Sequence, residues 1–313
     1  MKAILLEGFG PAENLQLREI EKPAPGADDV LVRVKAISIN PVDAKTRAGK
    51  GVAGRFRDAD PVILGWDISG TIEETGSRVT AFKTGDAVFG MVNFPGRGNA
   101  YAEYVVAPAA QLALKPARIS HEDAAAATLA ALTALEALVD HLKVQKGEKL
   151  LIHAAAGGVG HFAVQLGRHL GAHVIGTSSA ANRDFVLNMG ADEHIDYRSQ
   201  KLEDAVSGVD KVLDSVGGET IVQSLLVMKK GGIIVSLPSG KNDQVAEKAA
   251  EKGISGMPMM VQSSGANMET IADLLERGIL RPHVSKTFPL AGMADAHRFL
   301  ETGRTVGKVV ILP

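Results

Sequence analysis

The pattern of apolar and polar positions changes along the chain. Residues 1 to about 118 carry short apolar runs separated by Gly and Pro, at 30–37, 70–73, 86–90 and 101–106. Closely spaced short runs of this kind predict the strands of a compact, partly closed β domain. From Ser120 the composition becomes alanine-rich, and Ser120 with Asp123 three residues later predicts the start of a helix.

The middle of the chain alternates between candidate strands and helical segments. The candidate strands lie at 150–154, 174–177, 193–197, 211–214 and 232–237. Alternation of this kind predicts a parallel sheet covered by helices on both faces, and hence an α/β protein. A helix is expected near 293–301, followed by a final strand at 308–312, for which the amino-terminal β domain is the expected host.

A glycine-rich turn, His153-Ala-Ala-Ala-Gly-Gly-Val-Gly160, joins the first of these strands to a helical segment. Gly157 and Gly158 remove side chains where a backbone must approach a pyrophosphate, and Gly160 lets the helix pack close to the strand. The N–H groups at the helix start then face the phosphates. The first glycine of the G-x-G-x-x-G fingerprint is Ala155 here, so the match is incomplete. The predicted pyrophosphate-binding residues are Ala156, Gly157, Gly158, Val159 and Gly160.

The end of the second strand indicates which nicotinamide cofactor binds. Thr177, Ser178 and Ser179 stand where an NAD-selective site would place a carboxylate. Arg183 and Tyr197 are suitable donors for a 2′-phosphate, so NADPH is favoured over NADH. The alternative is that Arg183 is a solvated helix residue and Tyr197 a packing residue at a strand end.

Two further loops follow strand ends and are candidates to line the cofactor, because parallel sheets bind ligands at the carboxyl ends of their strands. They are 215–218 and 238–240. The residues predicted to contact the cofactor are Val216, Gly217 and Ser239 in these loops and Leu237 directly before the second loop.

Composition excludes several classes of function. The chain has 313 residues, enough for about two domains. A net charge of −2, with 4% aromatic residues and no basic cluster, argues against a nucleic-acid partner. The absence of cysteine excludes disulfides, thiolate nucleophiles and cysteine-based zinc sites. The longest apolar stretch, 124–139, contains Glu136, is too short to span a bilayer and predicts a buried helix. Because Glu7 and Gly8 interrupt the first apolar run, we expect no signal peptide and a cytoplasmic protein.

Several separated motifs together resemble the medium-chain dehydrogenase/reductase superfamily, in particular its zinc-free quinone oxidoreductase branch, with zeta-crystallin-like and alkenal/enone reductase-like members. The resemblance covers nearly the whole chain. The motifs are Asn40-Pro-Val-Asp43, Gly85-Asp-Ala-Val88, Leu132-Thr-Ala134, His153 to Gly160, Gly190-Ala-Asp192, Asp214-Ser-Val-Gly217 and Gly307-Lys308. The resemblance implies a Rossmann doubly wound NADPH-binding domain at 119–262, a GroES-like partly closed β-barrel domain from 1–118 and 263–313, and a homodimer.

The departures from the zinc alcohol dehydrogenases are informative. Those enzymes place a Cys where this chain has Asn40 and a His-Glu pair where it has Trp66-Asp67, so no zinc can be held in their way. Reduction of a carbon–carbon double bond conjugated to a carbonyl does not need a Lewis acid. Hydride adds to the β-carbon, and the oxygen that gains charge needs only hydrogen-bond donors. The resemblance therefore implies NADPH-dependent reduction of quinones, enones or alkenals.

The resemblance also implies roles near the nicotinamide. The segment from Asn40 to Arg47 looks most like alkenal/enone reductases, with Asn40 and Asp43 in the substrate environment. Lys45 is a candidate donor to the nicotinamide ribose, Thr133 a contact on the same side, and Lys308 a contact from the terminal strand. Alternatively, Asn40 and Asp43 cap a turn, Lys45 and Arg47 form a solvated face, and Thr133 bonds its own backbone.

Other residues carry weaker signals. His153 is interpreted as a structural histidine, and Trp66 as either a pocket wall or a packing residue. No proton donor is assigned, although Tyr101 and Tyr104 are phenols in the β domain. The alternative functions are an enoyl-thioester reductase and a non-catalytic NADPH-binding or RNA-binding protein.

Overall fold

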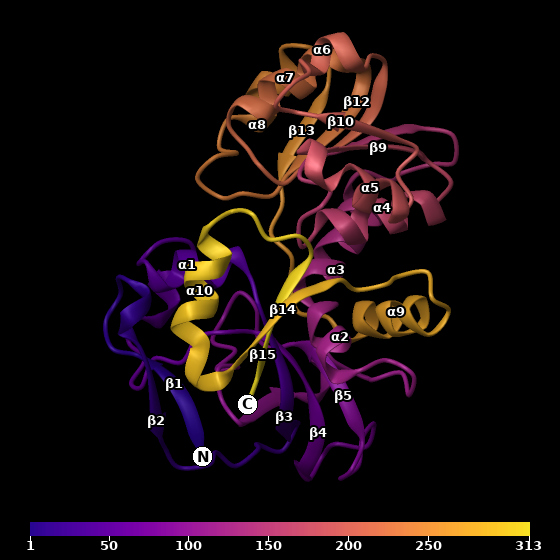
Figure 1. The fold of residues 1–313 in the computed structure, drawn as a ribbon. Coiled ribbons are helices and arrows are strands. Elements are labelled where there is room, and N and C mark those ends of the chain that lie inside the picture. Colours follow the sequence, from indigo (N-terminus) through magenta and orange to yellow (C-terminus); the bar gives the residue numbers. More distant parts are fainter. The chain divides into compact units, whose positions relative to one another are not determined.

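The chain folds into two compact units in a computed structural model that describes all residues, Met1–Pro313 (Figure 1). Unit 1 comprises Met1–Leu132, Val261–Gly278 and Pro282–Pro313, and unit 2 comprises Thr133–Met260 and Ile279–Arg281. The sequence predicts the first boundary at 118, whereas the first segment of unit 1 extends to Leu132. The predicted roles, substrate binding by one part and NADPH binding by the other, stay predictions.

The main sheet of unit 1 has seven strands. Their order is β14-β15-β3-β4-β5-β7, and β6 pairs with β3. The bounds are β3 (Asp29–Ile39), β4 (Asp67–Thr75), β5 (Ala87–Met91), β6 (Tyr104–Pro108), β7 (Leu112–Leu114), β14 (Val284–Pro289) and β15 (Lys308–Leu312). A separate hairpin pairs β1 (Lys2–Leu6) with β2 (Leu15–Glu19). The final strand pairs antiparallel with β3, which confirms the predicted host.

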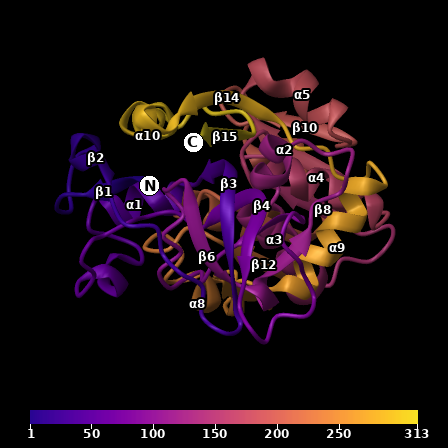
Figure 2. The ribbon, with the colours of Figure 1, turned by 90° about the horizontal axis from the view of Figure 1, so that it is seen from below.

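The helices of unit 1 pack around this sheet. They are α1 (Pro41–Arg47), α2 (His121–Ala126), α9 (Gly265–Glu276) and α10 (Met293–Glu301), while α3 (Leu129–Leu135) continues from unit 1 into unit 2. Figure 2 shows α10 beside β14 and β15. The predicted cap of α2 is confirmed, because the Ser120 hydroxyl accepts a hydrogen bond of 3.0 Å from the Asp123 backbone N–H.

The stretch 124–139 is buried for most of its length, but it is not one helix. It is divided among α2, α3 and a π-helical turn at Glu136–His141. At the break, the Thr128 hydroxyl donates to the Ala125 carbonyl oxygen, and the Leu129 N–H donates to the Asp67 carboxylate at 3.1 Å. These two bonds occur where the regular backbone hydrogen bonds of the helix are interrupted. The apolar pattern alone does not predict this interruption.

Unit 2 contains the predicted parallel sheet. Its six strands lie in the order β10-β9-β8-β11-β12-β13, and all pairings are parallel. The bounds are β8 (Lys149–Ile152), β9 (His173–Ser178), β10 (Glu193–Asp196), β11 (Val209–Asp214), β12 (Met228–Ser236) and β13 (Ser255–Pro258). The helices are α4 (Gly160–His169), α5 (Arg183–Asn188), α6 (Leu202–Ala205), α7 (Glu219–Val227) and α8 (Val245–Ala250).

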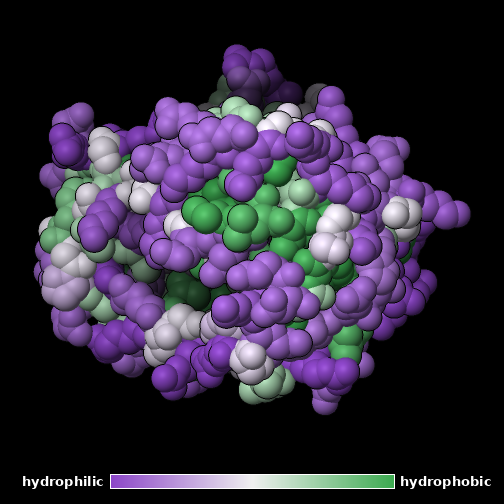
Figure 3. All heavy atoms as spheres, turned by 90° about the horizontal axis from the view of Figure 1, so that it is seen from above, coloured by the Kyte–Doolittle hydropathy of each residue, from purple (hydrophilic) through white to green (hydrophobic).

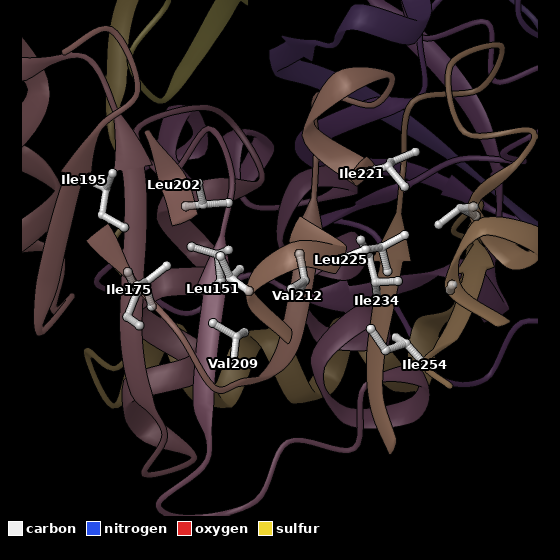
Figure 4. Packing of buried hydrophobic residues seen from close by; sticks show 14 residues of the cluster. Leu151, Ile175, Ile195, Leu202, Val209, Val212, Ile221, Leu225, Ile234 and Ile254 are labelled. Carbon is white, nitrogen blue, oxygen red and sulfur yellow. The ribbon is translucent and has the colours of Figure 1, made fainter. Parts of the chain in front are cut away.

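Alternate residues of these strands face opposite sides of the sheet. Leu151 and Ile175 point to the face covered by α6, α7 and α8, where they pack with Leu225 (Figure 4). Leu150 and Val174 point to the other face, where they leave no room for a side chain at Gly167 of α4. The sheet is therefore covered on both faces, as predicted. None of the helices in either unit has both the length and the apolar character needed to cross a membrane.

Candidate functional site

The glycine-rich turn of unit 2 has a tightly defined shape. Ala154, directly after β8, adopts a left-handed backbone conformation with φ 53°, and its carbonyl oxygen accepts a 2.8 Å hydrogen bond from the Gly157 N–H. A Cβ at Gly160 would collide with the Ala154 carbonyl, so α4 packs against the turn as predicted. The His161 N–H donates to the Gly157 carbonyl oxygen at 3.1 Å. The first N–H groups of a helix have no acceptor within it, so the remaining N–H groups at this end of α4 are candidate donors to an anion.

Three of the residues predicted to bind the 2′-phosphate lie together at the end of β9. Ser178 is the last residue of β9, and the Tyr197 N–H, directly after β10, donates to its carbonyl oxygen at 3.3 Å. Arg183 begins α5, with a largely exposed guanidinium whose one ion pair is a 3.5 Å contact with the exposed carboxylate of Asp184. A residue that sequence analysis missed, His194 of β10, hydrogen-bonds the Ser178 hydroxyl at 2.8 Å.

Thr177 points to the opposite face of the sheet. His153 lies buried between two hydroxyls there, with Nδ1 3.1 Å from Thr177 Oγ1 and Nε2 2.8 Å from Ser224 Oγ. Burial lowers the pKa of His153, so the ring is neutral at physiological pH. The interpretation of His153 as a satisfied structural histidine is confirmed.

A buried carboxylate, Asp214, fixes the loop after β11. Its Oδ1 accepts from the backbone N–H groups of Val216 and Gly217, each at 3.0 Å, and its Oδ2 accepts from Ser236 Oγ at 2.6 Å. The Leu237 N–H donates to the Asp214 carbonyl oxygen, so the two loops predicted to line the cofactor are tied together at one strand end. The motif Asp214-Ser-Val-Gly217 does not by itself predict this anchoring role.

Unit 1 holds a second group of candidate residues, clustered around Asn40. Asn40 follows β3, Asp67 begins β4 and Lys308 begins β15, and the pairing of these strands brings the three side chains together. Asn40 Nδ2 donates to Asp67 Oδ2 at 2.7 Å, and Lys308 Nζ donates to Asn40 Oδ1 and, at 3.1 Å, to the Ile39 carbonyl oxygen. Lys308 Nζ also lies 4.0 Å from Asp67 Oδ2. All three side chains are buried, and we call them the Asn40 cluster.

Asp43 adjoins this cluster from the first turn of α1. Its Oδ2 accepts a 2.5 Å hydrogen bond from the Asn40 backbone N–H, so Asn40 and Asp43 cap the turn at Pro41, which here opens α1. Their role beside the substrate stays a prediction. The other carboxylate oxygen of Asp43, Oδ1, is buried, and the hydroxyl of Tyr101 lies near the carboxylate. Burial, reinforced by the negative charge of Asp67, raises the pKa of Asp43 to about 7.

The other end of α1 departs from prediction. Arg47 is only 4% exposed, so the interpretation of Lys45 and Arg47 as a solvated face is wrong for Arg47. Its guanidinium binds both carboxylate oxygens of Glu301 at 2.6 and 3.1 Å, and its Nη1 lies 3.5 Å from His297 Nδ1. Both partners come from α10, some 250 residues away along the chain. Lys45 is partly exposed, and its role stays a prediction.

Tyr101 and His297 complete this buried region. The Tyr101 hydroxyl lies 2.9 Å from His297 Nε2, and both side chains are fully buried. Burial, with a smaller effect from Arg47, lowers the pKa of His297 to about 3, and burial raises the pKa of Tyr101 well above its ordinary value. The histidine is therefore neutral and the phenol protonated at neutral pH.

The Asn40 cluster does not fit a catalytic zinc. The Asn40 carbonyl oxygen is taken by an ammonium group and its amide nitrogen donates to a carboxylate, so it offers no free ligand atom. Trp66, at the position of the zinc-binding histidine, is a packing residue: it is fully buried against Phe56 and Phe94, and its indole N–H donates to the Gly96 carbonyl. No group of three His, Cys, Asp or Glu side chains in the structure could hold a metal ion.

The candidate residues thus form two groups in different units. The pyrophosphate and 2′-phosphate candidates, together with Val216, Gly217, Leu237 and Ser239, belong to unit 2, as does Thr133, which is buried in α3. Asn40, Asp43, Lys45 and Lys308 belong to unit 1.

Comparison with known proteins gives consistent matches along the chain. Residues 26–117 match the alcohol dehydrogenase GroES-like domain, and residues 189–311 match a zinc-binding dehydrogenase family. The 2-methylene-furan-3-one reductase of Solanum lycopersicum is 34% identical over 100% of this chain and 79% of its own length. The NADPH-dependent alkenal/one oxidoreductase of Arabidopsis thaliana is 33% identical over 100% and 80%.

Solved structures agree. The quinone oxidoreductase from Coxiella burnetii has a TM-score of 0.95 and 37% identity, covering 100% of this chain and 99% of its own. The Escherichia coli quinone oxidoreductase in complex with NADPH has a TM-score of 0.89 and 29% identity, covering 100% of both chains. With its Rossmann-like and GroES-like parts, the chain belongs to the medium-chain dehydrogenase/reductase superfamily, among its quinone oxidoreductase and alkenal/one reductase relatives.

Proposed function

We propose that this protein is an NADPH-dependent reductase of quinones or α,β-unsaturated carbonyl compounds that works without zinc. The main support for the proposal is the arrangement of candidate cofactor residues in unit 2. The glycine turn, Ser178, Arg183 and Tyr197 lie close to the neighbouring ends of β8, β9 and β10. The names of its relatives as quinone oxidoreductases and alkenal/one reductases support the same substrate class.

The residues of unit 2 bind and orient the cofactor. N–H groups at the start of α4 bind the pyrophosphate, while Arg183 and Tyr197 supply donors for a 2′-phosphate beside Ser178. The nearby carboxylate of Asp196 accepts hydrogen bonds from Ser199 Oγ at 2.7 Å and from the Arg198 N–H at 3.2 Å, which partly offset its negative charge.

When bound, the cofactor supplies a hydride to the β-carbon of the substrate. Charge then collects on the substrate oxygen, which needs hydrogen-bond donors rather than a metal. Within unit 1, Lys308 and Asp67 fix which way the amide of Asn40 faces, and Asn40 stays our candidate for the substrate environment. This mechanism is consistent with the poor fit of the Asn40 cluster to zinc.

Replacing Arg183 with Ala is expected to raise the Kd of NADPH at least about tenfold, because a charge-assisted pair with the phosphate is lost. The Kd of NADH should change little. Titrations that follow nicotinamide fluorescence measure both, with Arg168→Ala as a matched control, since Arg168 is an exposed residue near the other end of α4.

The same titrations decide the proposal when combined with turnover assays on a quinone, an enone, an alkenal and an enoyl thioester. Tight NADPH binding with turnover of the first three supports it. Equal binding of NADPH and NADH would refute the 2′-phosphate site, turnover of the thioester alone would favour an enoyl reductase, and no binding would remove the enzymatic role.

We also propose a cytoplasmic homodimer. What supports the dimer is exposed apolar surface on unit 2: Val222 and Leu226 lie one turn apart on α7 with 41% and 56% exposure. Figure 3, in which individual residues are not labelled, shows hydrophobic residues gathered near the middle of one face of the molecule, with hydrophilic residues around them. Size-exclusion chromatography with light scattering would give the oligomeric state.

A further inference from the structure

His194 lies at the phosphate end of the unit 2 sheet, although its sequence context gives no sign of a ligand role. It belongs to β10, the edge strand next to β9, where it pairs in register with Gly176, two residues before Ser178. Its ring is partly exposed and points to the same face of the sheet as Ser178. Arg183, at the start of α5, packs on this side as well.

The hydrogen bonds of Ser178 indicate which nitrogen of the neutral His194 ring carries the proton. The Ser178 hydroxyl donates to the Ser179 carbonyl oxygen at 3.1 Å, so toward His194 it acts as an acceptor. The neutral imidazole therefore carries its proton on Nε2. Its Nδ1 makes no hydrogen bond with the protein and is the atom that would gain a proton.

In the protein without a bound anion, the surroundings of His194 together disfavour protonation of its ring. Burial lowers the pKa of His194, and the guanidinium of Arg183 lowers it further, while Asp196 on the same strand raises it. These are the two charged groups that face the ring. A phosphate dianion bound to Arg183 beside Ser178 would place up to two negative charges near the imidazole and oppose the effect of Arg183.

We infer that His194 is a specificity-determining residue, which takes up a proton when the 2′-phosphate of NADPH binds and so makes the preference for NADPH over NADH stronger at lower pH. The inference rests on the proposed NADPH function. NADH lacks the phosphate, so its binding should not be linked to this proton. The sign follows from linkage: a group whose pKa is higher in the complex than in the free protein tightens binding as the pH falls.

The test compares the wild-type protein with His194→Gln between about pH 6 and pH 8, a range that extends upward from near the ordinary pKa of a histidine. Gln keeps a donor for Ser178 but cannot become charged. The 2′-phosphate has its own second pKa near 6, which weakens its binding at low pH in both proteins equally. The ratio of the two Kd values for NADPH therefore isolates the contribution of His194.

At pH 6 we expect the variant to bind NADPH about fivefold more weakly than the wild type, and the ratio should approach one near pH 8. NADH should bind both proteins equally at every pH. In addition, an NMR titration of the wild-type ring should give a higher pKa for His194 with NADPH bound than with NADH bound, a measurement that needs no variant.

Three results would overturn the inference. A variant-to-wild-type ratio for NADPH that does not change with pH, or an NMR pKa that is the same with both cofactors, shows that His194 does not respond to the phosphate. An equal loss of affinity for NADPH and NADH shows a purely structural role. If the wild-type protein shows no preference for NADPH at any pH, the proposed cofactor site itself is refuted. The other results concern His194 alone, and the effect of Arg183→Ala on NADPH binding would remain.

Discussion

Replacing Lys308 with Met is expected to lower the free energy of unfolding by about 3–5 kcal/mol, because it removes the only cation in contact with a buried carboxylate. Lys308 Nζ lies 4.0 Å from Asp67, which is itself fully buried. It also donates to the side-chain amide oxygen Oδ1 of Asn40 and to the backbone carbonyl oxygen of Ile39, and both acceptors would lose a partner.

The directions of the pKa values agree with this expectation. Burial lowers the pKa of Lys308 and raises that of Asp67, while each charge partly offsets the shift of the other. In the Lys308→Met variant Asp67 must either remain charged without a neighbouring cation or take up a proton. Both responses lower the free energy of unfolding.

Chemical denaturation of the variant checks this prediction, with Lys230→Met as the control, since Lys230 is an exposed lysine on β12 of unit 2. The control should change stability by about 0.5 kcal/mol or less. Adding Asp67→Asn to Lys308→Met should restore part of the loss. Equal stabilities of Lys308→Met and Lys230→Met would show that the Asn40 cluster is not the buried ion pair described above.

Replacing Asp43 with Asn is expected to change how stability depends on pH. The pKa of Asp43 is raised from 3.8 to about 7 in the folded protein, so the folded state binds its proton more tightly than the unfolded state. The stability that this proton contributes is fully present below pH 3.8 and is lost as the pH rises to about 7. The amide introduced by the substitution would keep an acceptor for the Asn40 N–H but would have no proton to lose.

Relative to wild type, Asp43→Asn should therefore gain stability as the pH rises from about 4 to about 8, by a few kcal/mol at about 1.4 kcal/mol per pKa unit. Denaturant unfolding of both proteins at several pH values measures the difference. Asp58→Asn, which changes an exposed carboxylate, is the control and should show no such trend. A difference between Asp43→Asn and wild type that is constant with pH would contradict the raised pKa.

Local patterns were enough to predict much of the fold. The parallel strands of unit 2 are short apolar runs bounded by turn residues, and their order of alternation with helices implies a covered sheet. The break in 124–139 was not predictable in this way. It coincides with a hydrogen bond from Leu129 to Asp67, a residue 62 positions earlier that only the folded chain brings there.

The same distinction applies to the candidate sites. The glycine turn and Ser178 could be identified because the spacing of a strand–helix–strand unit is local. Arg47 was misread because its partners on α10 are distant in sequence. His194 was missed because its relation to Ser178 depends on the register of two neighbouring strands, which no spacing along the chain reveals.

The most direct test of the proposed reaction is to supply NADPH that carries deuterium at the transferable position of the nicotinamide, with a simple enone and chelator-treated protein. We predict that the reduced product carries deuterium on its β-carbon and that added zinc does not increase the rate. Product without deuterium, or turnover that appears only after zinc is added, would contradict zinc-independent hydride transfer.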